Sequence, residues 1–357
     1  MNKLYSNELY LKNLDRACNC EFIEFERLKN KSILISGASG LIGSFLIDVI
    51  MKLNIEKNLN CKIFAIGRNK KNALNRFDMY KSNSCFKFYA INIINQINIS
   101  DIQNIDYVMH LASNTHPEAY ASDPIGTIMT NIMGLKNMLE VSVSNNARFL
   151  FASSCEIYGE NKGDVEKFCE NYLGYINCNT LRAGYPESKR CGEALCQAYI
   201  EQKSQYIVIA RLTRTFGPTM LMNDSKALSQ FIKKAINKEN IVLKSEGNQY
   251  YSYLYVADTV TGILKIMLDG LNGEAYNVSD ESCDVKLKDL AQKISLKVGT
   301  KVEYDLPSEL EKKGYSKATK ARLDNNKLLK LGWRPYYDID EALNNTIEIL
   351  ENTITKY

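Results

Sequence analysis

The stretch Ile33-Leu-Ile-Ser-Gly37-Ala-Ser-Gly40-Leu-Ile-Gly43 decides the fold of this chain. An apolar run rich in β-branched residues ends at three regularly spaced glycines, and an apolar helical pattern follows directly. This order predicts a strand, a tight turn and a helix. Gly37 permits the turn, Gly40 lets backbone N–H groups approach a pyrophosphate, and Gly43 lets the helix pack close to the strand. We expect a diphosphate at the helix N-terminus; the alternative is a packed turn without a ligand.

Length and composition set the class of protein. With 357 residues, the chain is long enough for one large α/β domain and a smaller lobe. The net charge is only +4, and the Lys and Arg residues are scattered among acidic residues, so the sequence does not predict nucleic-acid binding. The ten cysteines contain no C-x-x-C pair, which favours reduced thiols over disulfides or a metal site. The polar start and the lack of a long apolar run favour a cytoplasmic protein without a membrane span.

The end of the second predicted strand, Lys62–Ile66, bears on the choice of cofactor. An acidic residue at this strand end would accept hydrogen bonds from the adenosine ribose of NAD and repel a 2′-phosphate. No acid is present, and Arg68 lies beside the gap. Since a guanidinium can bind a phosphate in a bidentate, stacked contact, the chemistry favours NADP, with NAD as the second option. The alternative is a solvated basic loop.

Two further strands are predicted to end near the same ligand. One leads to Asn92 and Ile93, which we place at an adenine edge. The other, Tyr107–Leu111, ends in small residues that suit a backbone passing close to a cofactor. His110 within this strand is predicted to be a packed core residue, whereas His116 follows the strand end and is a candidate for the cleft.

A tyrosine and a lysine carry the predicted chemistry. Tyr185 and Lys189 open a predicted helix and lie four residues apart, so they share one helix face. A phenol that transfers protons needs a nearby cation, because the cation lowers the phenol pKa. Ser154, at the end of the strand that starts at Arg148, would orient a substrate oxygen. A chance surface pair is the alternative reading of an isolated Y-x-x-x-K.

Several motifs follow one another along the chain: the glycine turn, His110-Leu-Ala112, Ser153-Ser154, Tyr158-Gly159, Tyr185-x-x-x-Lys189, Arg211–Asp224 and Tyr253–Asp258. Their order and approximate spacing resemble those of the extended short-chain dehydrogenase/reductases, the NAD-dependent epimerase/dehydratase family, over roughly residues 31–350. In detail the chain is most similar in pattern to the UDP-glucuronate decarboxylase branch, through the last two segments.

The resemblance implies an α/β fold with a doubly wound parallel Rossmann sheet and a smaller C-terminal α/β substrate lobe. We expect residues 1–30 to be an N-terminal extension. Residues 31–212, with about 251–270, would form the NAD(P)-binding domain, and residues 213–250 and 271–357 the nucleotide-sugar-binding lobe. The resemblance also implies a homodimer with a four-helix interface, formed by the helix after Asp123 and the helix that carries Tyr185. Apolar residues on the first of these helices would suit the interface, although a helix buried within one chain would look similar: Ile125, Ile128, Ile132, Leu135 and Met138.

The resemblance further implies roles for individual residues. Tyr185 would be the acid/base, Lys189 would bind the nicotinamide ribose, and Ser154 would contact the reacting sugar oxygen. Glu156 is added as a candidate base, and no metal ligand is predicted. The expected cofactor-binding residues are Gly37, Ser39, Gly40, Leu41, Ile42, Gly43, Arg68, Asn92, Ile93, Leu111, Ala112, Ser113, Asn131, Tyr185 and Lys189. The expected substrate-binding residues are Thr115, His116, Arg214 and Tyr251.

Four departures from the family pattern concern the chemistry. Cys155 stands where dehydratases carry an aspartic acid and decarboxylases a serine, and a thiol with a pKa near ~8.5 is a poor acid. Thr219 replaces the arginine of decarboxylases. Arg214 replaces an asparagine, and Tyr251 replaces an arginine that clamps the diphosphate, so Arg214 is predicted to take over part of the anion contact.

Three functions follow from these residues. The first is an NADP(H)-dependent reductase acting on a keto or aldehyde group of a nucleotide-diphosphate sugar in capsular or other surface polysaccharide synthesis, with a CDP-hexitol-forming enzyme as one option. The alternative is a redox-neutral 4-epimerase, 4,6-dehydratase or UDP-glucuronate decarboxylase with bound NAD, in which Glu156 removes the C5 proton. The third, a cofactor-binding sensor without activity, is disfavoured by the complete set of Ser154, Tyr185 and Lys189.

Overall fold

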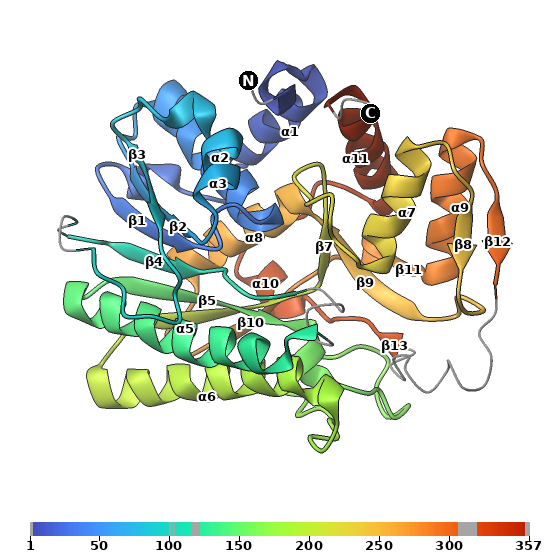
Figure 1. The fold of residues 1–357 in the computed structure, drawn as a ribbon. Helices are drawn as coiled ribbons and strands as arrows, with labels where there is room; N and C mark the ends of the chain where they lie inside the picture. Colours follow the sequence, from blue (N-terminus) through green and yellow to red (C-terminus); the bar gives the residue numbers. More distant parts are fainter. Residues whose placement is uncertain (1–2, 100–101, 103, 116–121, 306–319, 354–357) are drawn as a thin grey trace.

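A seven-stranded parallel sheet forms the centre of the molecule (Figure 1). The computed structural model describes residues 3–99, 102, 104–115, 122–305 and 320–353. The strand order is β10-β6-β5-β4-β1-β2-β3, so the chain reverses direction across the sheet between β1 and β4. The parallel strands and this reversal confirm the predicted α/β fold with a doubly wound Rossmann sheet. Doubly wound sheets bind ligands at the point of reversal, called the switch point. The strands are β1 (Ser32–Ser36), β2 (Lys62–Gly67), β3 (Phe86–Ala90), β4 (Tyr107–His110), β5 (Arg148–Ser154), β6 (Ile207–Leu212) and β10 (Ala275–Val278).

Helices cover both faces of this sheet. One face carries α2 (Leu41–Lys57) and α8 (Val256–Asp269), and α3 (Lys70–Arg76) lies between β2 and β3 in the chain (Figure 1). The other face carries α5 (Pro124–Asn145) and α6 (Gly184–Lys203). The start of α5 follows from its sequence, because Pro124 fits the first helical turn and the Asp123 carboxylate accepts a hydrogen bond from Gly126 N, at 2.9 Å.

A second, smaller sheet lies beside the first. Its strands are β7 (Arg214–Phe216), β9 (Tyr250–Tyr255), β11 (Asp284–Lys286) and β13 (Lys320–Ala321), and a separate pair is formed by β8 (Ile241–Leu243) and β12 (Val302–Tyr304). The nearby helices are α7 (Ala227–Ile236), α9 (Leu287–Val298) and α11 (Ile339–Thr353), whereas the short helix α10 (Asn326–Lys330) contacts β10 of the large sheet. β9 belongs to this small sheet, whereas α8, which follows it directly, packs on the large sheet. The domain limits given above remain a prediction.

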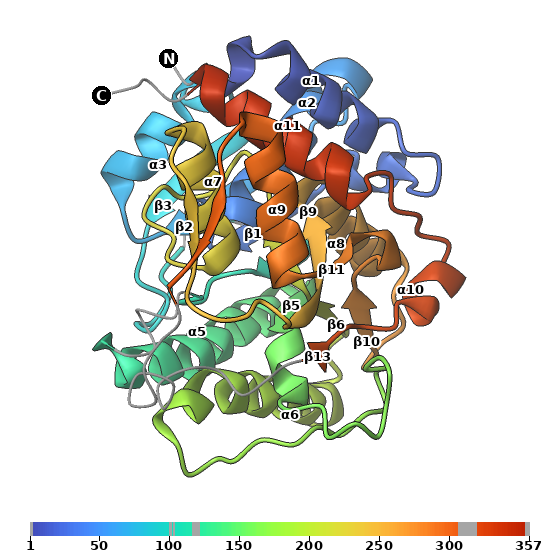
Figure 2. The same ribbon diagram turned by 90° about the vertical axis from the view of Figure 1, so that its right-hand side faces the viewer.

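The N-terminal segment forms a helix that joins the two parts of the molecule. Helix α1 (Glu8–Cys18) packs against α2 and α8, and α11 crosses beside it (Figure 2). Leu14 and Tyr10 of this helix are both buried. The N-terminal segment is therefore part of the core.

Two single residues, His110 and Trp333, pack in the core, and for His110 this confirms the prediction. His110 is buried, its Nδ1 lies 2.8 Å from Ser36 Oγ, and its ring stacks on Phe151. Trp333 is fully buried, and its Nε1 donates a hydrogen bond to Thr261 Oγ1 on α8, at 3.1 Å. Both residues therefore hold elements together inside the core.

The ten cysteines are free. Within the part of the chain that the structure describes, no group of three or more His, Cys, Asp or Glu side chains could hold a metal ion. No described helix combines the length and the apolarity that crossing a bilayer requires.

Candidate active site

The glycine turn is shaped for a close ligand. Gly37 has φ +72°, and a Cβ atom on it would lie 2.7 Å from Ala112 N, at the end of β4. A Cβ atom on Gly43 would lie 2.4 Å from Gly37 O, so α2 packs directly on the turn. Gly40 is the N-cap of α2 and has no side chain to cover the first N–H groups of the helix. The turn therefore fits a diphosphate on the helix N-terminus.

The residues predicted at the adenosine end lie on the neighbouring strand ends. Arg68 follows β2, is exposed, and its Nη2 donates to Asn114 Oδ1, at 3.2 Å. Ser39 lies in the glycine turn itself, and its Oγ would be 3.5 Å from a Cβ atom on Gly67. Arg68 thus lies beside the switch point between β1 and β4, where doubly wound sheets bind ligands in a crevice.

The segment after β3 is held from α5. Asn92 Oδ1 accepts a hydrogen bond from Ile94 N, at 3.3 Å, and Ile93 is buried against Gly134. Asn137 Nδ2 donates to the Ile93 carbonyl, at 2.8 Å. The sequence analysis missed Asn137; its signal was a polar residue on the inner face of a predicted apolar helix.

Tyr185 and Lys189 lie on one face of α6, below the end of β5. Lys189 is buried, its Nζ donates to the Ala152 carbonyl, at 2.8 Å, and lies 6.0 Å from the centre of the Tyr185 ring. Burial raises the pKa of Tyr185, and hydrogen bonding with Ser154 acts in the opposite direction. Burial also lowers the pKa of Lys189 to about 7. The expected lowering of the phenol pKa by Lys189 is therefore not seen, because desolvation outweighs it.

A chain of hydrogen bonds fixes the backbone of Tyr185. Ser113 Oγ donates to Asn131 Oδ1, at 2.7 Å, and Asn131 Nδ2 donates to Ser188 Oγ, at 2.8 Å. Ser188 Oγ in turn donates to the Tyr185 carbonyl, at 2.8 Å. Asn131 is fully buried, so this chain links the end of β4 to α6 through α5. Ser188 was missed, although it lies within the Tyr185–Lys189 motif.

An ion pair joins the end of β5 to the small sheet. Arg214 Nη2 lies 3.1 Å from Glu156 Oε1, and Cζ of Arg214 lies 3.8 Å above the ring centre of Tyr251. Arg214 Nη1 is 3.8 Å from Cys155 Sγ. Burial raises the pKa of the Cys155 thiol, so the thiol is neutral near pH 7. The structure thus brings together three of the four positions at which the chain departs from the family pattern, namely Cys155, Arg214 and Tyr251.

Thr219 serves the glycine turn instead. Its Oγ1 donates to the Leu41 carbonyl, at 2.8 Å, and so ties the Gly-Pro loop after β7 to the start of α2. Lys226, just before α7, reaches the same crevice from the small-sheet side, since its Nζ donates to Thr115 Oγ1, at 3.3 Å. Lys226 was missed, because a lone lysine in a polar segment carries no signal. His116 lies outside the described residues.

A second, half-buried network lies one helical turn from Lys189 along α6. Glu193, one turn further along α6, pairs with Arg211 Nη2, at 2.7 Å, and accepts a hydrogen bond from Ser153 Oγ, at 2.5 Å. Arg211 Nη1 also donates to Tyr158 Oη, at 2.9 Å. Glu193 was missed by the sequence analysis, and its charge favours the ammonium form of Lys189.

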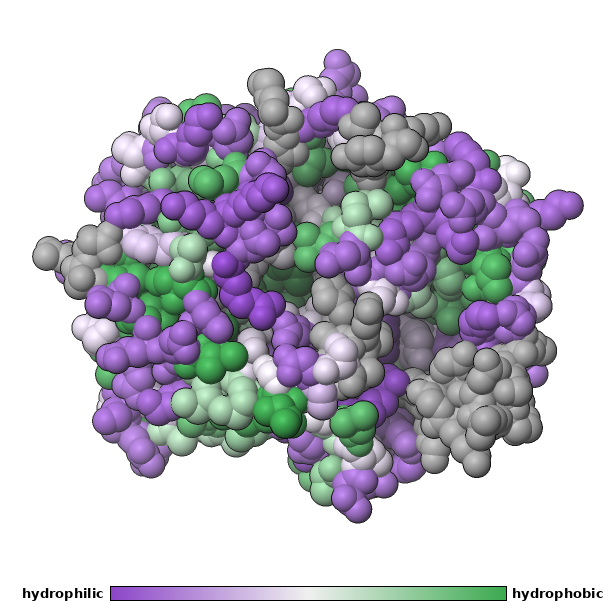
Figure 3. Space-filling model, in the orientation of Figure 1, coloured by the Kyte–Doolittle hydropathy of each residue, from purple (hydrophilic) through white to green (hydrophobic). Residues whose placement is uncertain are grey.

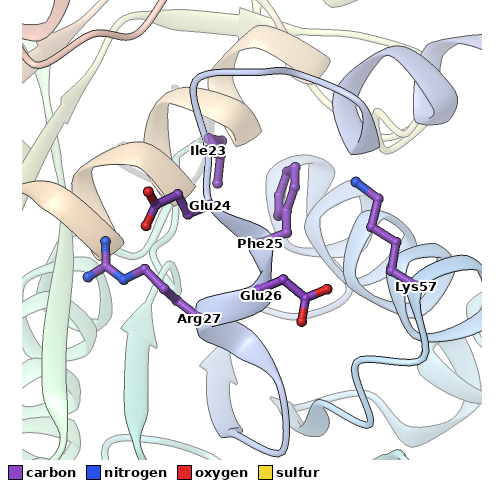
Figure 4. Close-up of a pocket in the computed structure, with 6 residues that line it drawn as sticks. All are labelled: Ile23, Glu24, Phe25, Glu26, Arg27 and Lys57. Atoms are coloured by element: carbon purple, nitrogen blue, oxygen red, sulfur yellow. The ribbon is translucent and has the colours of Figure 1, made fainter.

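The surface is hollowed between the part over the large sheet and the part over the small sheet (Figure 3). A separate pocket of about 350 Å³ lies on the N-terminal segment, where Phe25 and Lys57 face each other (Figure 4). Lys57 Nζ lies 5.1 Å from the centre of the Phe25 ring. None of the residues lining this pocket is a predicted site residue, so this pocket is not the candidate active site.

Comparisons with known proteins agree with this geometry. The model of the NAD dependent epimerase/dehydratase family matches residues 33–279. UDP-glucuronic acid decarboxylase 1 of Xenopus tropicalis is 32% identical over 340 residues, which cover 94% of this chain and 77% of that protein.

Solved structures share the fold. A dTDP-glucose 4,6-dehydratase, DesIV from Streptomyces venezuelae, solved with NAD bound, gives a TM-score of 0.77 at 18% identity, over 89% of this chain and 96% of that chain. The UDP-glucuronic acid 4-epimerase of Bacillus cereus, in complex with UDP-glucuronic acid and NAD, also gives 0.77, at 21% identity, over 90% and 99%. The chain therefore belongs to the NAD dependent epimerase/dehydratase family and is an oxidoreductase-type enzyme of the extended short-chain dehydrogenase/reductase class.

Proposed function

We propose that the protein converts a nucleotide-diphosphate hexuronate, through a C4 ketone, into the decarboxylated pentose nucleotide without net oxidation or reduction. The observation that carries this proposal is the ion pair between Arg214 and Glu156, at 3.1 Å. Glu156 follows Ser154 directly after the end of β5, and Arg214 begins β7. Arg214 supplies a cation that can bind the carboxylate of the sugar, and Glu156 beside it supplies a carboxylate that can transfer a proton. The names of the relatives, UDP-glucuronic acid decarboxylases, support the same substrate class.

The residues on α6 and β5 act at sugar C4. When bound, the nicotinamide ring supplies the acceptor for a hydride from C4 and returns that hydride before the product leaves. Tyr185 accepts the proton of the C4 hydroxyl and gives it back, and Ser154 orients the same oxygen. Lys189 holds the ribose next to the ring and, as an ammonium ion, favours the phenolate of Tyr185. Its folded pKa of about 7 makes this help sensitive to pH near neutrality.

Arg214 and Glu156 act at C5 and C6. A C4 ketone is β to the C6 carboxylate, so the C5–C6 bond can break with its electron pair delocalised into the ketone, and CO₂ leaves. Arg214 binds the carboxylate in the substrate, which releases Glu156 from its ion pair. Glu156 then takes up a proton from solvent and delivers it to C5, which restores the C4 ketone. The buried thiol of Cys155 stays neutral and supplies space rather than a charge.

NAD is the proposed cofactor, because a hydride that is returned in each cycle needs no reduced cofactor from the cell. The reductase reading is kept as a second candidate for one reason: Arg68 stands at the end of β2 without an acidic neighbour there, which suits a 2′-phosphate. Affinities for NAD and NADP, measured on the wild type and on Arg68→Ala, test this point. A preference for NADP that disappears in the variant would favour the reductase.

We also propose that the two sheets bind different ligands. The large sheet with its helices would bind the dinucleotide, and the small sheet with α7 and α9 would bind the nucleotide sugar. Arg214 on β7, Tyr251 on β9 and Lys226 before α7 support this division, because all three reach the crevice from the small-sheet side. Arg214 and Lys226 place positive charge where a diphosphate and a uronate would lie.

A homodimer through α5 and α6 is a further part of the proposal. Ile125 is 75% exposed, Met129 is 40% exposed and Leu181, just before α6, is 67% exposed. Leu135 and Met138 are instead buried in the core of this chain, so the expectation that they contribute to the interface is wrong. Ile125→Glu should convert a dimer into monomers in light scattering, and an unchanged mass would argue against this face.

One incubation tests the main proposal. Purified protein is mixed with UDP-glucuronate, without added reduced cofactor, and the products are followed by mass spectrometry and CO₂ release. The proposal predicts a UDP-pentose and CO₂ in equal amounts. A UDP-hexuronate of unchanged mass but altered C4 configuration would identify an epimerase. Turnover that requires stoichiometric NADPH, followed near ~340 nm, would identify the reductase.

A further inference from the structure

A buried carboxylate that the proposed mechanism does not use lies on α2, the helix that follows the glycine turn. Asp48 on α2 is fully buried. Its oxygens accept hydrogen bonds from Tyr5 and Tyr10 of the N-terminal segment, from Arg76 at the end of α3, and from Tyr80. The donors therefore come from three separate parts of the chain.

The members of this Asp48 cluster also bind one another. The phenol oxygens of Tyr5 and Tyr80 lie 2.7 Å apart, and Arg76 donates to Tyr5 Oη, at 3.2 Å, and to Tyr10 Oη, at 3.3 Å. Arg76 Nη2 also donates to the Ser44 carbonyl of α2, at 3.3 Å. A buried charge is tolerated only with such partners, and removing one partner costs more than the single bond, since it leaves polar atoms unpaired.

The position of the cluster links the two elements that face the adenosine half of a dinucleotide. Asp48 lies seven residues after Leu41, two helical turns from the N-terminus of α2 that faces the diphosphate. Arg76 ends α3, a helix of one to two turns that begins just after Arg68. The Asp48–Arg76 ion pair therefore sets the position of the Arg68 segment relative to the glycine turn.

The same N-terminal helix also reaches the small-sheet side. Asn345 Nδ2 on α11 donates to Asn13 Oδ1 of α1, at 3.1 Å, between buried side chains. Arg16 pairs with Glu341 of α11, at 2.9 Å. Residues 3–18 thus bridge α2 and α3 on one side and α11 on the other.

We propose that residues 3–18 are a positioning element for the dinucleotide: through Tyr5 and Tyr10 they hold α2 and α3 in the arrangement that binds the diphosphate and the adenosine ribose together. The inference rests on the dinucleotide site and not on which sugar is converted. Tyr5, Tyr10 and Arg76 are positioning residues, because they act through Asp48 and the two helices. Loss of the phenol groups lets the Arg68 segment move relative to α2, and the dinucleotide then loses contacts at one end.

Binding measurements on the full chain test the proposal. In Tyr5→Phe/Tyr10→Phe, we expect the Kd for NAD and for ADP-ribose to rise about tenfold or more, while the Kd for UDP changes less than about twofold. Tyr206→Phe is the matched control, since its Oη donates to the Gly270 carbonyl, at 3.1 Å, away from the crevice. It should leave all three affinities unchanged.

A second readout separates positioning from stability. Amide hydrogen exchange should show faster exchange over residues 68–76 in the double variant, with residues 148–154 of β5 still protected. The single variant Tyr10→Phe serves if the double variant is too unstable to purify. A variant with a lowered melting temperature but an unchanged Kd for NAD and ADP-ribose would overturn the proposal, and so would an equal loss of UDP affinity. Failure to convert UDP-glucuronate would leave these binding results unaffected.

Discussion

Lys189 Nζ lies 6.0 Å from the centre of the Tyr185 ring and donates its hydrogen bond to the Ala152 carbonyl instead, at 2.8 Å. Both side chains are buried, and burial shifts the two pKa values in opposite directions: up for the phenol and down to about 7 for the ammonium group. Desolvation thus favours the neutral form of each group. Proton transfer from a sugar hydroxyl needs these preferences to be offset by the bound ligands.

Tyr185→Phe tests the acid/base role directly. The ring and its packing remain, while the proton acceptor is lost, so kcat should fall by about 10²- to 10⁴-fold. The affinities for NAD and for the nucleotide sugar, measured by calorimetry, should stay within about twofold of the wild type. Tyr175→Phe, at an exposed position, serves as the control. A variant that keeps the wild-type kcat would remove Tyr185 from the mechanism.

Arg214→Gln tests the recognition of the sugar carboxylate. Because hydrogen bonds between charged groups contribute about 1.5–3 kcal/mol, the KM for UDP-glucuronate should rise by about 10- to 100-fold. The affinity for UDP-glucose, which has no carboxylate, should not fall. Arg190→Gln is the control, since this half-buried arginine donates to the Leu173 carbonyl. Equal losses for both sugars would assign Arg214 to the diphosphate instead.

Gly43→Ala tests the shape of the turn. The new methyl group would lie 2.4 Å from Gly37 O, so α2 or the turn must move. The Kd for NAD should rise about tenfold or more and the melting temperature should fall. Gly184→Ala is the matched control, because its nearest neighbour is the flexible side chain of Ile128, at 3.2 Å. A Gly43→Ala protein that binds NAD normally would contradict the packing described for the turn.

The burial of His110 predicts that the free energy of unfolding decreases as the pH is lowered. Burial lowers its pKa to about 3 in the folded state, whereas the unfolded chain takes up this proton near pH ~6.5. The unfolded state therefore binds more protons between these values, and the stability contributed by neutral His110 is lost as the pH falls from about 6.5 to about 3. Urea unfolding at a series of pH values should show this slope, and His110→Asn should flatten it. An unchanged slope in the variant would assign the acid sensitivity to other groups.

The sequence was sufficient for the elements that depend on local patterns. The glycine turn, the strands around it and the Tyr185–Lys189 helix follow from spacing and apolar periodicity, and the doubly wound parallel sheet follows from the resemblance. Asn131 was placed near the cofactor, but its link through Ser188 to Tyr185 depends on how α5 packs on α6.

Contacts between distant segments were not predictable. Arg214 and Tyr251 belong to different strands of the small sheet, and only their pairing in space puts a guanidinium over a ring and beside Glu156. The Asp48 cluster is a similar case, because an aspartate in an apolar helix shows no partner until residues 5, 10, 76 and 80 converge on it. The pKa of Tyr185 was misjudged because spacing reveals a neighbouring charge but not the loss of water.

The only tryptophan of the chain gives this protein a built-in optical probe. Trp333 lies in the segment before α11 and packs on α8, where a Cβ atom on Gly262 would lie 3.5 Å from its indole ring. Its emission should be blue-shifted while this segment is docked on α8 and should shift to the red when the segment detaches. Fluorescence therefore reports on the docking of that segment separately from the melting of the large sheet, which circular dichroism follows.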